Sequence, residues 1–236
     1  MITTRSVAVL GLSLIVGLAI FGYQVGRAVK KGREFDRYLT VRGLSEREVK
    51  ATLAIWPIRF SVDAEDLVTL KSAMERDRTT VIAFLQESGL DSKDIILGLP
   101  AVADRLDERV AAEKLSLPRF KGTVSIVVRS SNVDLVKKAI QHVDVLLDKG
   151  VALTANGFGD RTEFLFTEVN QIKPDMIREA TANARAAAEK FAEDSKTKVG
   201  AIRRATQGAV EIEDRDTASP EKKVIRVVTT IDFFVE

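Results

Sequence analysis

Apolar and polar residues alternate along several segments of the chain, and this period of two is typical of half-buried β-strands. The clearest signal is the last segment, VIRVVTTIDFFV. The earlier segments are shorter or are interrupted by turn-forming residues. The pattern predicts strands over residues 38–43, 49–62, 95–102, 120–129, 151–155, 163–169, 201–212 and 224–235.

A helical period separates these strands at three places. Apolar side chains recur every three or four residues after Asp63, after Ser131 or Asn132, and over Lys173–Ser195. Asp63 and one of the two residues Ser131 and Asn132 are expected to cap the first two helices. A glycine is expected to end each helix: Gly89, Gly150 and Gly200.

The third predicted helix, Lys173–Ser195, has an unusually alanine-rich apolar stripe. Pro174 is expected in its first turn, where a missing N–H does no harm. Alanine favours the helix and lets its backbone lie close to a sheet or to a second helix. The stripe therefore predicts a closely packed partner. Its expected members are Met176, Ala180, Ala184, Ala187, Ala188 and Phe191.

Helices separated by runs of strands predict an α+β fold, with antiparallel sheets and three long helices packed on one face. Pro57 cannot donate a hydrogen bond to a ladder, so its strand is expected to be at an edge, kinked or bulged there. Trp56, the only tryptophan, is expected to fill the core or an interface. Gly208 suggests a bulge or a close approach inside its strand.

The segments between these elements carry further expectations. Ser45–Glu48 is predicted to be a polar turn, and residues 103–118 are predicted to be irregular. The glycines of NGFGDRT, residues 156–162, lack the spacing of a phosphate-binding loop. This link is therefore predicted to be a hairpin turn between strands 151–155 and 163–169.

The N-terminal segment is the one long uncharged run of the chain. Residues 6–25, SVAVLGLSLIVGLAIFGYQV, hold no charge, and about 20 helical residues cover roughly 30 Å, the thickness of a bilayer core. A cleaved signal peptide is the main alternative, but its hydrophobic region should be shorter and should end in a small-x-small site. A buried soluble helix is a further alternative. The sequence predicts a membrane anchor over residues 1–26.

A basic linker is predicted over residues 27–37, followed by one domain over residues 38–236. The cations Arg27, Lys30, Lys31 and Arg33 can bind anionic lipid headgroups or can simply be solvated. Their excess over Arg5 and the amino terminus, taken alone, would place the C-terminal side in the cytoplasm.

Composition narrows the possible chemistry. The chain has no cysteine, so it has no disulfide, thiolate nucleophile or cysteine metal site. His142 is the only histidine, and any catalytic triad or histidine metal site would have to use it. The 36 basic and 34 acidic residues leave a net charge of +2, which favours no nucleic-acid partner. We expect no cofactor, no metal and no nucleic acid.

An enzyme would have to draw on a small set of groups. Asp104, Asp107 and Glu108 lie near Arg105 and Arg109 in the sequence. Such a cluster is usually a solvated ion-pair surface. His142 is predicted to face solvent, on the helix face opposite much of the apolar stripe. We therefore expect no catalytic residue set.

Three stretches carry a resemblance: Lys173–Ser195, the ATQG of Ala205–Gly208 and the closing VIRVVTTIDFF. They are similar to the SIMPL-domain family of periplasmic, YggE-like bacterial envelope proteins, and Val41–Phe60 resembles that family's first strand pair. The resemblance implies an α+β domain exported across the inner membrane and self-association, since one relative forms a large channel-shaped ring. It also implies a link to envelope or oxidative stress, and it provides no catalytic residue.

Three functions follow as hypotheses. The first is a non-enzymatic, membrane-anchored envelope protein whose domain forms a homo-oligomer. The second is an adaptor for another envelope protein or for anionic lipid, and the third is an enzyme. We expect the first, as a single-pass protein of the bacterial inner membrane with its C-terminal domain in the periplasm. This location conflicts with the charge count, and the resemblance is given more weight.

Overall fold

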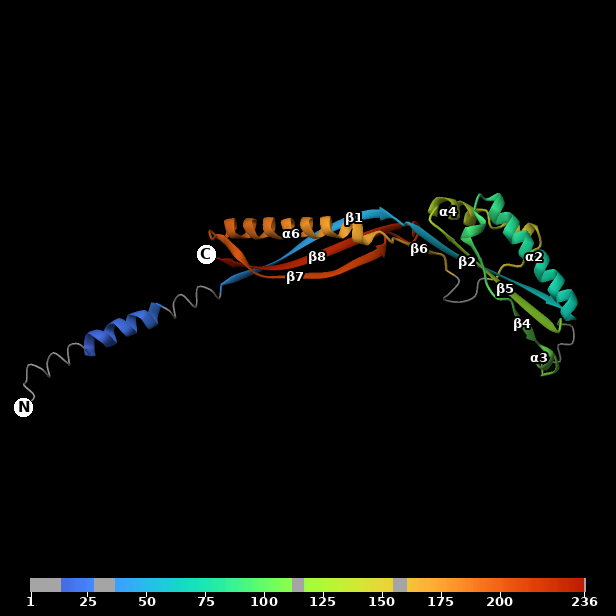
Figure 1. Cartoon of the computed structure of the whole chain (residues 1–236), viewed down its shortest axis with the longest axis horizontal. Helices are drawn as coiled ribbons and strands as arrows, with labels where there is room; N and C mark the ends of the chain where they lie inside the picture. Colours follow the sequence, from blue (N-terminus) through green and yellow to red (C-terminus); the bar gives the residue numbers. More distant parts are fainter. Residues whose placement is uncertain (1–13, 28–36, 112–116, 155–160, 236) are drawn as a thin grey trace, which may run out of the picture. The chain divides into compact units, whose positions relative to one another are not determined.

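The computed structural model describes residues 14–27, 37–111, 117–154 and 161–235, and of Glu108, Arg109 and Ala111 it describes the backbone only. These residues form an α+β fold with antiparallel sheets and several helices (Figure 1). The chain divides into two compact units. The first comprises Met1–Arg47, Asn170–Glu211 and Ile225–Glu236, and the second Glu48–Val169 and Ile212–Val224.

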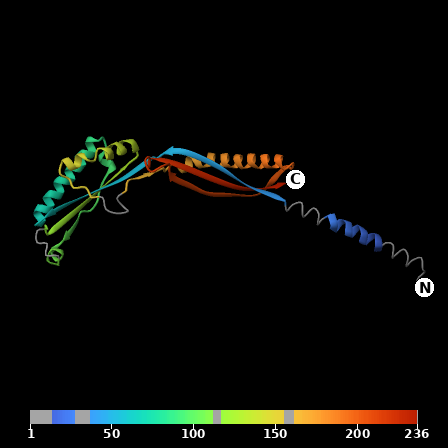
Figure 2. The same cartoon turned by 180° about the vertical axis from the view of Figure 1, so that it is seen from behind.

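The first unit is built on a three-stranded sheet of order β1-β8-β7, and Figures 1 and 2 show α6 lying along it. The side chains of β8 alternate between buried and half-buried, as the period of two predicts. Its buried residues Ile231 and Phe233 pack with Ala184 and Ala188. The elements are β1 (Tyr38–Lys50), α6 (Val169–Asp194), β7 (Val199–Asp214) and β8 (Lys222–Val235).

The alanine stripe of α6 has the closely packed partner that the sequence predicts, but its membership differs. The prediction included Ala187 and Phe191, and both are exposed, Phe191 by 56%. Four-residue steps keep a narrow stripe facing the sheet, whereas these two positions point away from it. The buried members are Met176, Ala180, Ala184, Ala188 and Ala192.

The ends of α6 also differ from the prediction. The helix begins at Val169, so Pro174 lies inside it rather than in the first turn. Gly200 does not end the helix, because it lies in β7. Lys196 follows the helix with a φ of 55°, the left-handed conformation that often follows a helix end.

The first strand is longer than its pattern suggested. The turn expected at Ser45–Glu48 is absent, and β1 continues to Lys50. The Ser45 side chain is buried and its hydroxyl donates to Glu179 Oε2 at 2.9 Å. Glu46 accepts a hydrogen bond from Arg226 at 2.7 Å. Because Ser45 and Glu46 have hydrogen-bond partners within the first unit, they do not interrupt the strand.

The second unit centres on the antiparallel pair β2 (Leu53–Ala64) and β5 (Phe120–Ser130). The predicted strand 95–102 is two short strands, β3 (Ile95–Leu97) and β4 (Ala101–Asp104), which pair with the other edge of β5 and have Pro100 between them. The short strand β6 (Glu163–Leu165) pairs with β2.

The helices of the second unit bring two corrections. Asp66, rather than Asp63, caps α2 (Leu67–Glu87), and it accepts from the backbone N–H groups of Val68 and Thr69 at 3.0 and 2.9 Å. The second predicted long helix is two shorter ones, α4 (Val133–Gln141) and α5 (Val145–Asp148). Asn132 caps the start of α4, and α5 ends before Gly150. The expectation of three long helices on one face is therefore wrong: among the described residues from 37 onward only α2 and α6 are long, and they pack in different units.

Other expectations for the second unit are confirmed in part. Trp56 is buried in the core. On the side of β2 away from β5, Pro57 lies between the pairing of residues 53–55 with β6 and the bridge of Phe60 to Leu153. Among the described residues no strand pairs with Pro57 on that side, so its missing N–H breaks no ladder hydrogen bond there. A short helix α3 (Leu106–Ala111) forms within the segment predicted to be irregular. The predicted strand 151–155 makes a single bridge, and residues 155–160 of the predicted hairpin turn lie outside the described residues.

In the N-terminal segment, residues 14–27 form a helix whose large apolar side chains are exposed. Within the described part of the chain, no helix combines the length and the apolar content that crossing a bilayer requires. Residues 1–13 of the predicted anchor and residues 28–36 of the predicted linker lie outside the described residues. Of the linker cations, Arg27 is described, and its guanidinium lies 5.4 Å from the centre of the Tyr23 ring.

Candidate functional site

Asp104, one of the acidic residues considered for catalysis, takes part in a structural ion pair. Asp104 accepts hydrogen bonds from Arg119, at 2.8 Å for the closest, and from the backbone N–H of Leu106 at 3.0 Å. The hydrogen bond from Arg119 is the main reason that the pKa of Asp104 lies below its ordinary value. A carboxylate held ionised in this way is a poor proton donor near neutral pH.

The rest of this cluster does not converge on one point. Arg105 forms an ion pair with Asp63, at the end of β2. Asp107 is exposed, and the side chains of Glu108 and Arg109 lie outside the described residues. The described members therefore form separate surface pairs, as the solvated-surface interpretation predicts.

His142 is exposed at the C-terminal end of α4, as predicted. Its Nδ1 lies 2.8 Å from the backbone carbonyl oxygen of Lys138, which accepts the hydrogen bond. This bond ties the imidazole to its own helix. Among the described residues, no group of three or more potential ligands is placed to hold a metal ion.

The edge formed by β1 is covered by α6. The side chain of Asn183 donates to the backbone carbonyl of Leu44 at 2.8 Å, so it uses a group that a neighbouring strand would otherwise bond. A side chain at Gly43 would overlap the carbonyl of Ala180, and its Cβ would lie 2.6 Å from the backbone N of Ala184. Helix and strand thus meet backbone to backbone at Gly43 on the face of the sheet, and from there Asn183 of the helix blocks a carbonyl of the β1 edge.

The opposite edge of the same sheet, β7, is open. Within the described part of the chain, β8 is the only strand beside it. Every residue over 201–209 is exposed, although this stretch lies inside a regular strand. Gly208 makes the close approach that the sequence suggested, because a Cβ there would lie 3.1 Å from the carbonyl oxygen of Val228. An uncovered edge strand of this length is a template for pairing with another chain.

The charges along β7 are separated by sign. Arg203 and Arg204 lie in its N-terminal half, and Glu211 lies toward its C-terminal end. Arg203 stacks over the Tyr38 ring at 4.2 Å from its centre. Between these charges the residues Ala205, Thr206, Gln207, Gly208, Ala209 and Val210 carry no charge. The edge thus has a basic end, a neutral middle and an acidic end.

The second unit has an apolar groove between α2 and the strands β3 and β4. Its lining includes Leu70, Met74 and Val124, and its charged lining residues are Lys71, Glu75 and Arg78, of which Glu75 and Arg78 form an ion pair. Large apolar side chains are exposed on the segment beside it: Ile96, Leu97, Leu99, Val102, Leu106 and Val110. Exposed apolar surface of this kind is typical of an interaction site.

The second unit also buries charged side chains, and Glu221 is one of them. Glu221 is 6% exposed and one of its carboxylate oxygens pairs with Lys137, while Oε2 has no partner among the described residues. Burial raises the pKa of Glu221, but the hydrogen bond from Lys137 and the nearby positive charge outweigh it, so that the pKa lies below its ordinary value. This pair holds the turn that precedes β8 beside α4 within the second unit.

Sequence reasoning did not find the contacts that close the β1 edge. Gly43 interrupts an alternating strand, which was a usable signal for close approach. Asn183 and Glu179 lie far from β1 in sequence and carried no such signal. The alanine stripe could be predicted because all of its residues lie in one helix, where their spacing is visible in the sequence.

Comparison with known proteins gives one family. The model of the SIMPL family, described as "Protein of unknown function (DUF541)", matches residues 39–230. Among curated proteins, the chain is 25% identical over 133 residues to the DNA-directed RNA polymerase subunit beta' of Saccharophagus degradans. That match covers 52% of this chain and 9% of the polymerase subunit, so the chain spans less than a tenth of that relative.

Proposed function

The chain belongs to the SIMPL family, and from this premise we propose that it is a non-catalytic protein of the bacterial cell envelope whose SIMPL domain self-associates into an oligomer. In this proposal the N-terminal segment anchors the protein in the inner membrane and the domain lies in the periplasm. The family description names no activity, and the described acid and histidine candidates form separate structural contacts.

The observation that carries the proposal is the open edge of β7. Soluble proteins usually protect such edges with proline, charge, a bulge or a covering element. Here the β1 edge of the same sheet is covered by α6, while β7 keeps an exposed, uncharged middle. An edge left open beside one that is closed is well suited to pairing with a second chain.

The anchor is supported by the residues at the N-terminus. Residues 14–25 are helical where described and uncharged, and their large side chains are exposed on all sides of the helix: Leu14, Ile15, Val16, Leu18, Ile20, Phe21, Tyr23 and Val25. A helix that is apolar all round requires an apolar environment. Anchoring would also confine copies of the domain to one surface and raise their effective concentration.

Gentle extraction of the full-length protein from membranes, followed by light scattering, tests self-association. The expected result is a defined species of several copies at micromolar concentration. A monomer under these conditions would contradict the proposal. A reporter fused after Glu236 tests the location separately, because it should be active only when that end is periplasmic.

The proposal includes a role in the response of the cell to stress. Resemblance to envelope proteins associated with oxidative or envelope stress suggests a protective, scaffolding role. Deletion of the gene should then sensitise cells to oxidants or to envelope-damaging agents, and the full-length chain should restore growth. Equal growth of the deletion and parent strains under those stresses would contradict this role without bearing on oligomerisation.

An adaptor function is the second candidate, and the apolar groove of the second unit favours it. The exposed side chains beside α2 and β4 offer an apolar surface with Lys71 and the Glu75–Arg78 ion pair at its rim. Such a groove fits an amphipathic segment of another envelope protein better than it fits a bilayer. Covalent cross-linking in intact cells from a photoreactive residue at Leu99, which is 93% exposed, should then yield one discrete heteromeric product. A product formed only between copies of this chain would contradict the adaptor.

A further inference from the structure

We propose that β7 pairs with the β7 strand of a second copy in antiparallel orientation, with the two Gln207 residues opposite each other at a twofold axis. This inference rests on the proposed self-association and specifies its contact. It makes one edge of the three-stranded sheet the interface and leaves the edge covered by α6 outside it.

The separation of charge along β7 sets the orientation. In an antiparallel pair, the basic end with Arg203 and Arg204 lies beside the end of the other copy that carries Glu211. In a parallel, in-register pair, each charge would lie beside its own copy. Opposite charges across neighbouring strands stabilise the pair and like charges destabilise it, so the antiparallel arrangement is favoured.

The neutral middle of the strand sets the register. Centring the pair on Gln207 places Arg203 opposite Glu211 and Ala205 opposite Ala209, once on each side of the axis. Small alanine side chains then oppose each other, and the Gln207 side-chain amide, which can both donate and accept a hydrogen bond, lies opposite the Gln207 amide of the second copy. Moving the centre by one residue in either direction places Glu211 opposite an alanine instead, Ala201 or Ala205.

The two edges of the sheet differ in their capacity to form this pair. At β1, Asn183 already donates to the carbonyl of Leu44, and α6 lies against Gly43. At β7, the described residues include no strand or helix beyond the edge. An isologous contact through β7 alone would therefore give a closed pair of chains rather than an open fibre.

Because the natural chain has no cysteine, single substitutions test the register directly. Gln207→Cys in the full-length protein, oxidised in membranes, should give a disulfide-linked dimer, since directly opposite residues of antiparallel strands have Cα atoms about 4.5–5.5 Å apart. Ala201→Cys is the matched control in the same strand. Its copies would be about 12 residues apart along the pair, roughly 40 Å, and should not cross-link.

Charge reversal provides an independent test. Glu211→Arg in the Gln207→Cys background should slow cross-linking by about threefold or more, because it sets Arg203 against a like charge on both sides of the axis. Adding Arg203→Glu restores opposite charges and should restore the rate. Melting temperatures of each variant establish that the domain remains folded.

The outcomes separate this inference from the proposed function. Cross-linking at Gln207 without cross-linking at Ala201 supports the antiparallel pair. Equal cross-linking at both positions indicates parallel strands and overturns the inference. A dimer from Cys at Ala205 or Ala209, with none from Cys at Gln207, indicates another register and also overturns it. An oligomer by light scattering without a cross-link at Gln207 also overturns the β7 contact and leaves self-association standing, whereas a monomer contradicts both.

Discussion

The two compact units both place helices against a sheet, but they fill the space between helix and sheet differently. In the first unit, α6 presents alanines, and Gly43 lets its backbone meet the strand directly. In the second unit, large side chains such as Phe60, Leu85 and Leu146 fill the space. The first unit should therefore be most sensitive to added volume and the second to lost volume.

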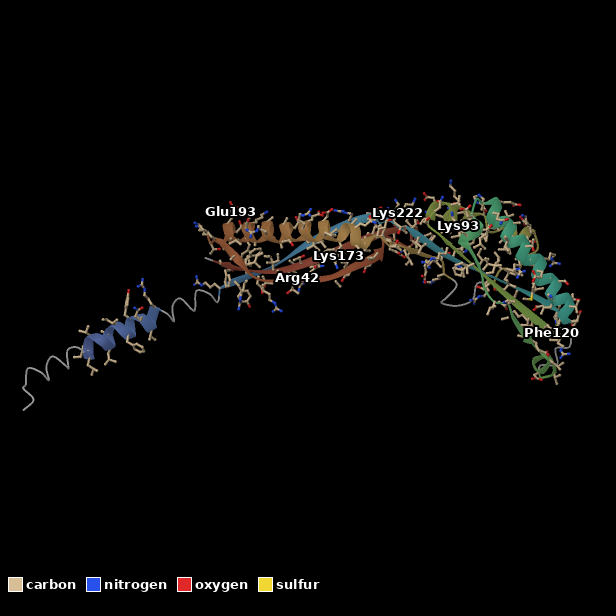
Figure 3. The ribbon with its side chains drawn as sticks, viewed as in Figure 1. Arg42, Lys93, Phe120, Lys173, Glu193 and Lys222 are labelled. Atoms are coloured by element: carbon tan, nitrogen blue, oxygen red, sulfur yellow. The ribbon has the colours of Figure 1, made fainter. Side chains whose placement is uncertain are left out.

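The sheets also differ in how their edges are treated. In the second unit, both central strands have short neighbours: β3 and β4 beside β5, and β6 beside β2. In the first unit, one edge is covered by a helix and the other is open along β7. This difference places the capacity for self-pairing in the first unit. Figure 3 shows charged side chains along its helix, with Lys173 and Glu193 labelled, so the exposed face of α6 is polar.

The largest predicted effect is the loss of volume in the second unit. Phe60→Ala should lower the free energy of unfolding by about 3–5 kcal/mol, because Phe60 is fully buried in the core. Hydrogen exchange of the full-length protein would locate the loss, and protection should fall in β2 and β5 more than in α6. An equal fall in α6 would contradict the separate cores.

The next effect is added volume where helix and strand backbones touch. Gly43→Ala should destabilise the first unit by about 3 kcal/mol, since the new methyl group would overlap the carbonyl of Ala180 and force the helix away. Hydrogen exchange should show lost protection in α6 and β1. Unchanged protection there would mean that the helix does not lie against this strand in solution.

Ala184→Leu examines the same surface from the helix side. Ala184 is fully buried, so the larger side chain should cost about 1–3 kcal/mol through overpacking. Ala187→Leu is the matched control, because Ala187 lies on the same helix and is exposed. Thermal unfolding should separate the two variants, and equal melting temperatures would contradict the strict four-residue stripe.

The sequence predicted the features that depend on neighbouring residues better than those that depend on residues far apart in the chain. Strands such as 120–129 and the presence of the α6 helix depend on local periodicity, and the structure confirms them. The continuity of β1 through Ser45 depends on Glu179 and Arg226, which lie far away in the sequence. The assignment of Phe191 to the stripe failed because a three-residue and a four-residue step are both compatible with helical periodicity, and only the sheet selects between them.

The candidate site shows the same limit. The alanine stripe of the sequence predicted a closely packed helix, and the resemblance of the chain to the SIMPL family led us to expect that copies associate. It did not indicate which edge was open, because that depends on Asn183 covering β1 and on no described element covering β7. The ion pairs Asp104–Arg119 and Asp63–Arg105 likewise arise from strand order rather than from the clustering of charge in the sequence.

A smaller effect concerns the helix ends of the second unit. The Asn132 side chain accepts a hydrogen bond from the backbone N–H of Leu135 at 3.2 Å and caps α4. Asn132→Ala should therefore cost about 1 kcal/mol. Ser131→Ala is the neighbouring control, because Ser131 is exposed and does not cap the helix. Chemical denaturation should give a lower midpoint for Asn132→Ala than for Ser131→Ala. Equal midpoints would show that the Asn132 cap does not stabilise α4.

The smallest effect is a pH dependence that should belong to the second unit alone. Among the described residues, the carboxyl groups with a lowered pKa lie there: Asp66, Asp104, Asp134, Asp216 and Glu221.

At Asp66, hydrogen bonds from the backbone and side chain of Thr69 are the main cause of the lowered pKa. A carboxyl whose folded-state pKa is depressed contributes stability above its unfolded pKa, near 3.9, and loses it as the pH falls through the folded value. Asp66→Asn keeps a capping oxygen but cannot titrate. Its melting temperature should therefore fall less than that of the natural chain between about pH 5 and pH 2. Parallel curves would show that the charge on Asp66 does not stabilise α2, and a fall in protection of α6 over the same range would contradict the assignment of the acid sensitivity to the second unit.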